Sequence, residues 1–192
     1  MATSRENLDV DWVPVISTAV GAAVALSATL LSYVLRSRDE RGRAHRADRQ
    51  QSYLDFMLAL DGAHARLREV AEPTRTATDL DRDTGRAVSD SKVYEARERL
   101  LMSASPAVVR AGERAFLSVI EMRDAVRKGA KRGTVEFHHT YHVLSEAKWR
   151  LRRTVRVDLD SKPLTLTDLD KTSWDAREDC ELCAPKERAA AE

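Results

Sequence analysis

The chain has few of the residues that break helices or build strands. Its 192 residues include seven glycines and five prolines, and only 5% of the residues are aromatic. Ala, Arg, Leu and Glu, which favour helices, are abundant. A chain of this composition forms helices rather than strands.

An excess of charge of either sign is also missing. The chain holds 32 Lys and Arg against 31 Asp and Glu. Dedicated nucleic-acid binders usually carry a clear basic excess, so nucleic acid is not expected as a partner. The sequence has no phosphate-binding glycine loop, no Ser/His/Asp arrangement and no paired catalytic carboxylates. We therefore predict neither an enzyme nor a cofactor.

One long segment carries no charge at all. Residues 12–35 run for 24 positions without Asp, Glu, Lys or Arg. A helix of this length extends about 36 Å, and the hydrocarbon core of a bilayer is about 30 Å thick. Trp12 and Tyr33 lie near opposite ends, where aromatic rings favour the headgroup zone. Residues 1–11 have one arginine and three acids, which is the wrong sign for a cleaved signal peptide. We predict a transmembrane helix over residues 12–35 after a short extracytoplasmic N-terminus.

The flanks of this segment predict its orientation. Residues 36–50 contain six arginines, and only Arg5 precedes the segment. The positive-inside rule then puts the N-terminus outside and the bulk of the chain in the cytoplasm, with a single pass through the inner membrane of a bacterium. Membrane lipid is a predicted partner, because arginines beside a membrane contact anionic headgroups for about 1 kcal/mol each. The flanking arginines nearest the segment are Arg36, Arg38, Arg41 and Arg43.

Small residues recur within the uncharged segment. Ser17, Gly21 and Ala25 are four positions apart, a spacing that lets two transmembrane helices approach closely. This pattern predicts a homo-oligomer or a partner helix, although an alanine-rich segment also contains such spacings by chance.

The residues that follow have helical periodicity. Apolar positions three or four apart predict helices ending at about residue 71, over 93–103, from Pro106 to about 126, and from Thr134 to about 158. Ser105 and Thr134 are expected N-caps, and Gly112 is expected at a close helix contact. The predicted core stripes include Tyr53, Leu60, Leu67, Val93, Leu100, Val109, Phe116, Val119, Phe137, Leu144, Leu151 and Val155. Amphipathic helices with short links bury their faces in an antiparallel bundle of about four helices.

Two segments lack this periodicity. Within the predicted bundle, residues 51–158, the polar residues 73–91 are predicted to be a loop whose end caps the next helix. Residues 159–192 are predicted to be an acidic, partly disordered tail that either folds back on the basic last helix or stays loosely ordered. The fold class is therefore all-α, with an N-terminal transmembrane helix, a small cytoplasmic bundle and a tail.

Two clusters carry residues that ligate metals. His138 and His142 are one helical turn apart, but the pair lacks an obvious third ligand, and His139 forms part of a Glu-x-x-His spacing that has no second copy. Cys180 and Cys183 form a CxxC pair, which supplies two of the four ligands of a structural zinc site. No metal is predicted, and these five residues remain weak candidates.

The layout resembles small single-pass membrane proteins of high-GC bacteria such as actinobacteria, in which a helical bundle lies in the cytoplasm. Arginine outnumbers lysine 25 to seven, which resembles the usage of such genomes. The predicted function is a non-enzymatic interaction or scaffold module that binds a protein partner or a second copy. The alternatives are a metal-binding protein and a membrane-tethered nucleic-acid-binding protein that uses the basic residues 148–156.

Overall fold

The computed structural model describes residues 13–72, 76–175, 177 and 180–183. Inside these ranges, the side chains of residues 13–25, 27–30, 34, 35, 39 and 77 are not described. The chain divides into two compact units, Met1–His45 and Arg46–Glu192. Every regular element in the described ranges is helical, so the prediction of an all-α protein is confirmed.

The first unit contains the beginning of helix α1, Val13–Val70. In the part of the chain that is described, no helix offers a stretch long and apolar enough to cross a membrane. The predicted transmembrane helix over residues 12–35 is therefore not supported by the described residues, which leave out most of its side chains. Trp12, predicted at the membrane interface, lies outside the described residues, and the side chains of Ser17, Gly21 and Ala25, predicted at a helix contact, are not described. The described anchor-flank residues Tyr33, Arg36, Arg38, Arg41 and Arg43 are all exposed.

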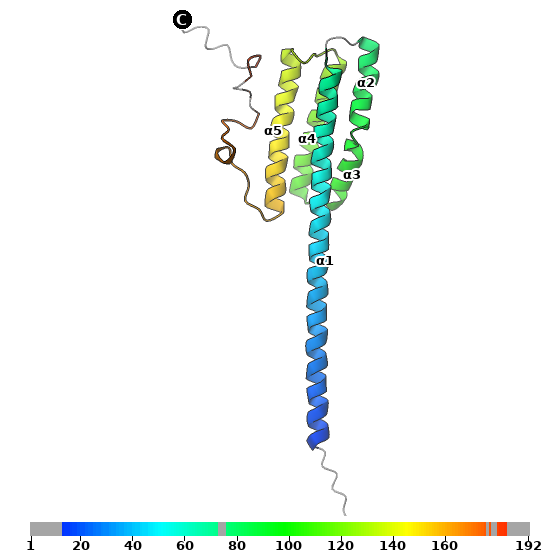
Figure 1. Cartoon of the computed structure of the whole chain (residues 1–192), viewed down its shortest axis with the longest axis vertical. Coiled ribbons are helices and arrows are strands. Elements are labelled where there is room, and N and C mark those ends of the chain that lie inside the picture. The colour runs from blue at the N-terminus through cyan, green and yellow to red at the C-terminus, as the bar shows by residue number, and fades with distance from the viewer. Residues whose placement is uncertain (1–12, 73–75, 176, 178–179, 184–192) are drawn as a thin grey trace, which may run out of the picture. The chain divides into compact units, whose positions relative to one another are not determined.

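The second unit is an antiparallel helical bundle (Figure 1). Residue 46 onward of α1 packs with α2 (Ala77–Ser89), α3 (Val93–Ser103), α4 (Pro106–Arg127) and α5 (Val135–Asp158). The chain direction alternates from α1 to the α2–α3 pair, to α4 and to α5, and α2 and α3 follow one another along one side. The predicted antiparallel bundle is confirmed.

The predicted loop over residues 73–91 is wrong, because this stretch contains α2. Thr76 caps the helix, and its hydroxyl oxygen accepts a hydrogen bond from the backbone N–H of Asp79 at 3.3 Å. The buried face of α2 includes Leu80, Val88 and a fully buried Thr84. The Thr84 hydroxyl donates to the backbone carbonyl of Leu80 at 2.6 Å, which satisfies it inside the helix. The helix was not predicted because the polar Thr84 occupies a core position, which interrupts the helical spacing of apolar residues in this segment.

The junction between α2 and α3 also differs from the prediction. We expected the end of the predicted loop to cap the next helix, but Asp90 there is the C-cap of α2. The N-cap of α3 is Lys92, which has a left-handed backbone with φ of 58° and forms no side-chain cap hydrogen bond. The left-handed backbone of Lys92 separates α2 from α3, so two short helices form where one long helix would otherwise continue.

The core runs through all the helices of the bundle. Its largest fully buried side chains are Tyr53, Phe56, Leu60, Leu67, Leu100, Met122, Leu144 and Leu151. Gly112 on α4 lies at the closest approach: a Cβ atom added there would be 2.4 Å from Leu100 Cδ2 and 3.4 Å from Phe56 Cε1. The expected helix contact at Gly112 is confirmed.

A polar network joins α1 to the end of α5. The Tyr53 hydroxyl donates to Asp158 Oδ2 at 2.6 Å and accepts from Arg49 Nε at 3.1 Å. Arg49 also pairs directly with Asp158, and the two side chains are only 23% and 11% exposed. Because these charges are largely withdrawn from water, each depends on the other for its hydrogen bonds.

Replacement of Asp158 by alanine is therefore expected to lower the free energy of unfolding by about 2 kcal/mol, because Arg49 and Tyr53 lose their partner. The matched control is Asp160→Ala, which removes a pair with Arg46 whose side chains are 58% and 76% exposed. An exposed pair contributes about 0.5 kcal/mol or less. Urea unfolding of the full chain, followed by circular dichroism, measures both. Equal losses in the two variants would contradict this account.

The described part of the tail lies along α5 (Figure 1). Trp174 packs on Trp149, with ring centroids 5.5 Å apart, and the guanidinium of Arg153 lies 5.0 Å from the Trp174 ring. A short 3-10 helix, Thr167–Leu169, interrupts the tail. The sequence left two alternatives open for the tail. The described residues follow the first of them, in which the tail folds back on the last helix.

Candidate functional site

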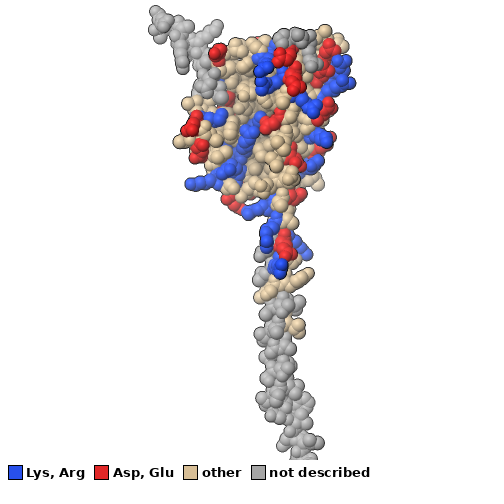
Figure 2. Space-filling model, viewed as in Figure 1, with Lys and Arg blue, Asp and Glu red and all other residues tan. Residues whose placement is uncertain are grey.

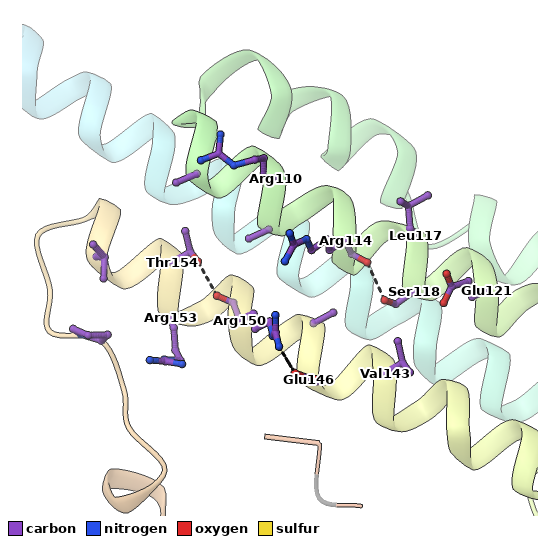
Figure 3. A pocket seen from close by; sticks show the side chains of 15 residues that line it. Arg110, Arg114, Leu117, Ser118, Glu121, Val143, Glu146, Arg150, Arg153 and Thr154 are labelled. Carbon is purple, nitrogen blue, oxygen red and sulfur yellow. Dashed lines mark hydrogen bonds and ion pairs between the residues drawn. The ribbon is translucent and has the colours of Figure 1, made fainter. Parts of the chain in front are cut away.

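A groove runs between α4 and α5 (Figure 3). Its volume is about 810 Å³, and Pro163, from the segment after α5, also lines it. Small side chains at Ala107, Ala111 and Ala147 line it, so the two helices do not fill the space between their outer edges. The sequence forms this groove by placing alanines on both helices that border it.

Exposed apolar side chains add to the groove lining. Leu117 on α4 is 53% exposed, and Val157 on α5 is 56% exposed. A single exposed apolar residue needs no explanation, but several around one groove are typical of a binding surface.

The groove is also basic. Arg110 and Arg114 extend from α4 into this region, opposite Arg150 and Glu146 of α5 (Figure 3). Arg150 pairs with Glu146, with Nε and Oε1 3.0 Å apart. Within the described ranges, neither Arg110 nor Arg114 has an acidic partner. On the face shown in Figure 2, acidic and basic side chains are interspersed.

The basic residues 148–156 are largely engaged within the bundle. Lys148 pairs with Asp61 of α1, and Arg152 lies 3.5 Å from the other carboxylate oxygen of Asp61. Arg156 donates to the backbone carbonyl of Lys162 at 2.7 Å. This run stabilises the α1–α5 contact, so it does not support a nucleic-acid surface.

The structure brings together three of the five candidate metal ligands. One ligand atom each from His138, His142 and Cys180 lies within 4.8 Å of the others. Cys183 is on the same turn as Cys180, with its backbone N–H 3.0 Å from the Cys180 carbonyl oxygen. His139 is exposed on another side of α5 and takes no part. The third ligand that the sequence did not reveal comes from the tail folding back.

The groove itself was missed by sequence reasoning. Arg110, Arg114 and Leu117 fall outside the core stripe of α4, and Leu117 is the one signal that could have indicated a second face. Comparison with family models, curated proteins and solved structures finds no match for this chain.

Proposed function

We propose that the chain is a single-pass membrane protein whose bundle binds an acidic amphipathic helix of a partner protein in the groove between α4 and α5. The observation that carries the proposal is the combination of exposed apolar side chains with two unpaired arginines around one groove. An amphipathic helix binds such a groove through its apolar face.

The charges favour an acidic occupant. The groove lining contains four arginines and two glutamates, Glu121 and Glu146. Arg150 pairs with Glu146, and the guanidinium of Arg153 lies over the Trp174 ring. Of the remaining lining charges, the exposed Arg110 and Arg114 outnumber the single exposed Glu121. Acidic residues along the edges of a bound helix would pair with these arginines and would direct it to this groove rather than to the mixed surface elsewhere.

Membrane attachment is supported by the sequence. The 24 uncharged residues 12–35 have sufficient length, and the six arginines of residues 36–50 favour retention of the bundle in the cytoplasm. The partner is then a membrane-associated or cytoplasmic protein that the bundle holds close to the bilayer.

Site-specific photo-cross-linking in cells tests the groove. A photoreactive residue at Leu117 is expected to give one discrete adduct, whose partner carries an acidic amphipathic segment at the site of cross-linking. The matched control is Met102 on α3, which is 89% exposed but does not line the groove. Similar adducts from both positions would refute a groove-specific partner.

Charge reversal then tests the arginines. We expect the double change Arg110→Glu and Arg114→Glu to weaken binding of the cross-linked segment at least about tenfold, because attraction becomes repulsion. Binding to the unaltered groove should weaken as salt concentration rises. The control is Arg66→Glu on α1, an exposed arginine outside the groove. Unchanged binding in the double variant would contradict the proposal.

Membrane insertion is tested by labelling. A Ser4→Cys variant in intact cells is expected to react with a membrane-impermeant thiol reagent, whereas the parent chain should react only after permeabilisation. The chain should also stay in the membrane pellet after an alkaline wash, and removal of residues 12–35 should release it. Release of the full chain by the wash would exclude the anchor.

A further inference from the structure

The geometry points to a structural zinc site formed by His138, His142, Cys180 and Cys183, which fastens the tail to α5. The site is separate from the groove, and the proposal does not depend on a protein partner.

The two histidines present their ring nitrogens to one point. They lie one turn apart near the start of α5, and their ring centroids are 6.3 Å apart. Thr134 fixes the start of this helix, because its hydroxyl oxygen accepts from the backbone N–H of Phe137 at 3.4 Å. The cysteine sulfur of Cys180 lies 3.2 Å from His138 Nδ1. In a tetrahedral zinc site, bond lengths of about 2.0 and 2.3 Å put a nitrogen and a sulfur about 3.5 Å apart.

Hydrogen bonds set the tautomer of each histidine. His142 Nδ1 is 2.6 Å from the carbonyl oxygen of Asp175, and His138 Nε2 is 3.0 Å from the carbonyl oxygen of Arg132. A carbonyl oxygen only accepts, so each of these nitrogens carries the proton. The lone pairs are therefore on His142 Nε2 and His138 Nδ1. Metal-binding histidines show this arrangement, in which a backbone carbonyl orients the ring.

His142 supplies independent evidence for a ligand. The residue is only 2% exposed, and its Nε2 atom is buried without a hydrogen-bond partner in the described structure. A buried acceptor with no partner costs about 1–3 kcal/mol. A zinc ion bound to this nitrogen would remove the penalty and would explain why a histidine, rather than an apolar residue, occupies this core position.

Cys183, on the same turn as Cys180, would supply the fourth ligand, and it is not among the three whose ligand atoms lie within 4.8 Å of one another. Two cysteines separated by two residues on one turn are a common zinc-chelating pair, and two histidines at helical spacing are its usual complement. Four protein ligands leave no open position, so we infer a structural ion rather than a catalytic one. The ion would hold the tail beside Trp149 and Trp174, which already contact one another.

Metal analysis of the full chain, purified in reducing buffer with zinc supplied, is the direct test. We expect about one zinc per chain, and less than about a tenth of that in Cys180→Ser. The matched control His139→Gln changes an exposed histidine on the same helix and should keep its zinc. Because Cys180 lies on the tail, outside the core, its variant should keep the helical circular dichroism signal. Full zinc in Cys180→Ser, or no zinc in the parent chain, would overturn the proposal.

Two further measurements identify the ligands and the role. Replacing zinc by cobalt should give the absorption of a tetrahedral site with two thiolates, and Cys183→Ser should reduce it to one. A single thiolate in the parent chain would exclude Cys183. Removal of zinc by a chelator should speed proteolysis between residues 159 and 175 at least about tenfold, because the tail opens more often. An unchanged rate would refute the fastening role.

Discussion

Replacing Gly112 by leucine is expected to lower the free energy of unfolding by at least about 3 kcal/mol, the largest effect of any single change considered. A Cβ atom alone would come within 2.4 Å of Leu100 Cδ2 and 3.4 Å of Phe56 Cε1. Leu100 and Phe56 are 1% and 0% exposed, so neither can move into solvent. The added side chain must push α4 away from α1 and α3, which opens the core.

Gly85 provides the control for this prediction. It lies within α2, and a Cβ atom added there would meet nothing within 4 Å. Gly85→Ala should stabilise the protein by about 0.5–1 kcal/mol, because alanine favours a helix more than glycine does. Urea unfolding of the full chain, followed by circular dichroism, gives both values. A Gly112→Leu chain as stable as the parent would show that the helix contact is looser than the structure indicates.

The second large effect concerns pH and His64. Its ring packs against Tyr141 with centroids 5.4 Å apart, and Nε2 is buried without a partner in the described structure. Burial is the main cause that lowers the pKa of His64 from 6.5 to about 4, and the charges of Lys148 and Arg68 add to it, against Asp61. The folded protein thus keeps this ring neutral at pH values where the unfolded chain protonates it.

The sign of the effect follows from this difference. Above pH 6.5 the ring is neutral in both states, and the fold has its full stability. As pH falls from 6.5 towards 4, only the unfolded chain gains the proton, so stability falls by up to about 3 kcal/mol. Carboxylates also contribute to acid unfolding. The measurement is therefore the difference between the parent and His64→Gln, which should lose about 2–3 kcal/mol less over this interval.

The exposed His139 gives the matched control. His139→Gln should show the same pH dependence as the parent chain, because this side chain is exposed on α5 and does not pack in the core. If His64→Gln and the parent lose stability in parallel between pH 6.5 and 4, burial does not lower the pKa of His64.

Periodicity was sufficient to predict most of the bundle. Tyr53, Leu60, Leu67 and Leu100 are buried as expected, and α4 begins at Pro106 as predicted. On α4 the stripe was misplaced by one position at its start, because Val108 is fully buried instead of the expected Val109. Periodicity alone cannot decide which of two adjacent valines faces the core, since their directions on a helix differ by only about 100°.

The failure to predict α2 and the failure to join the histidine and cysteine clusters have different causes. α2 was missed because Thr84 occupies a core position and satisfies its hydroxyl on the backbone of its own helix. The sequence left open whether His138 and Cys180 belong to one site, because they are 42 positions apart and no local pattern indicates that a polar tail returns to a helix. The spacing of residues along the sequence does not show where a tail without helical periodicity docks.

The distance along the chain between α1 and its α5 partners has a consequence for synthesis. Arg49 and Asp158 are 109 positions apart. At about 5–20 residues per second, a ribosome takes about 5–20 s to make the intervening chain. Throughout that interval the apolar face of α1, with Phe56 and Leu60, has no α5 to cover it. A nascent chain stalled before residue 158 is therefore expected to recruit chaperones that the finished bundle does not bind.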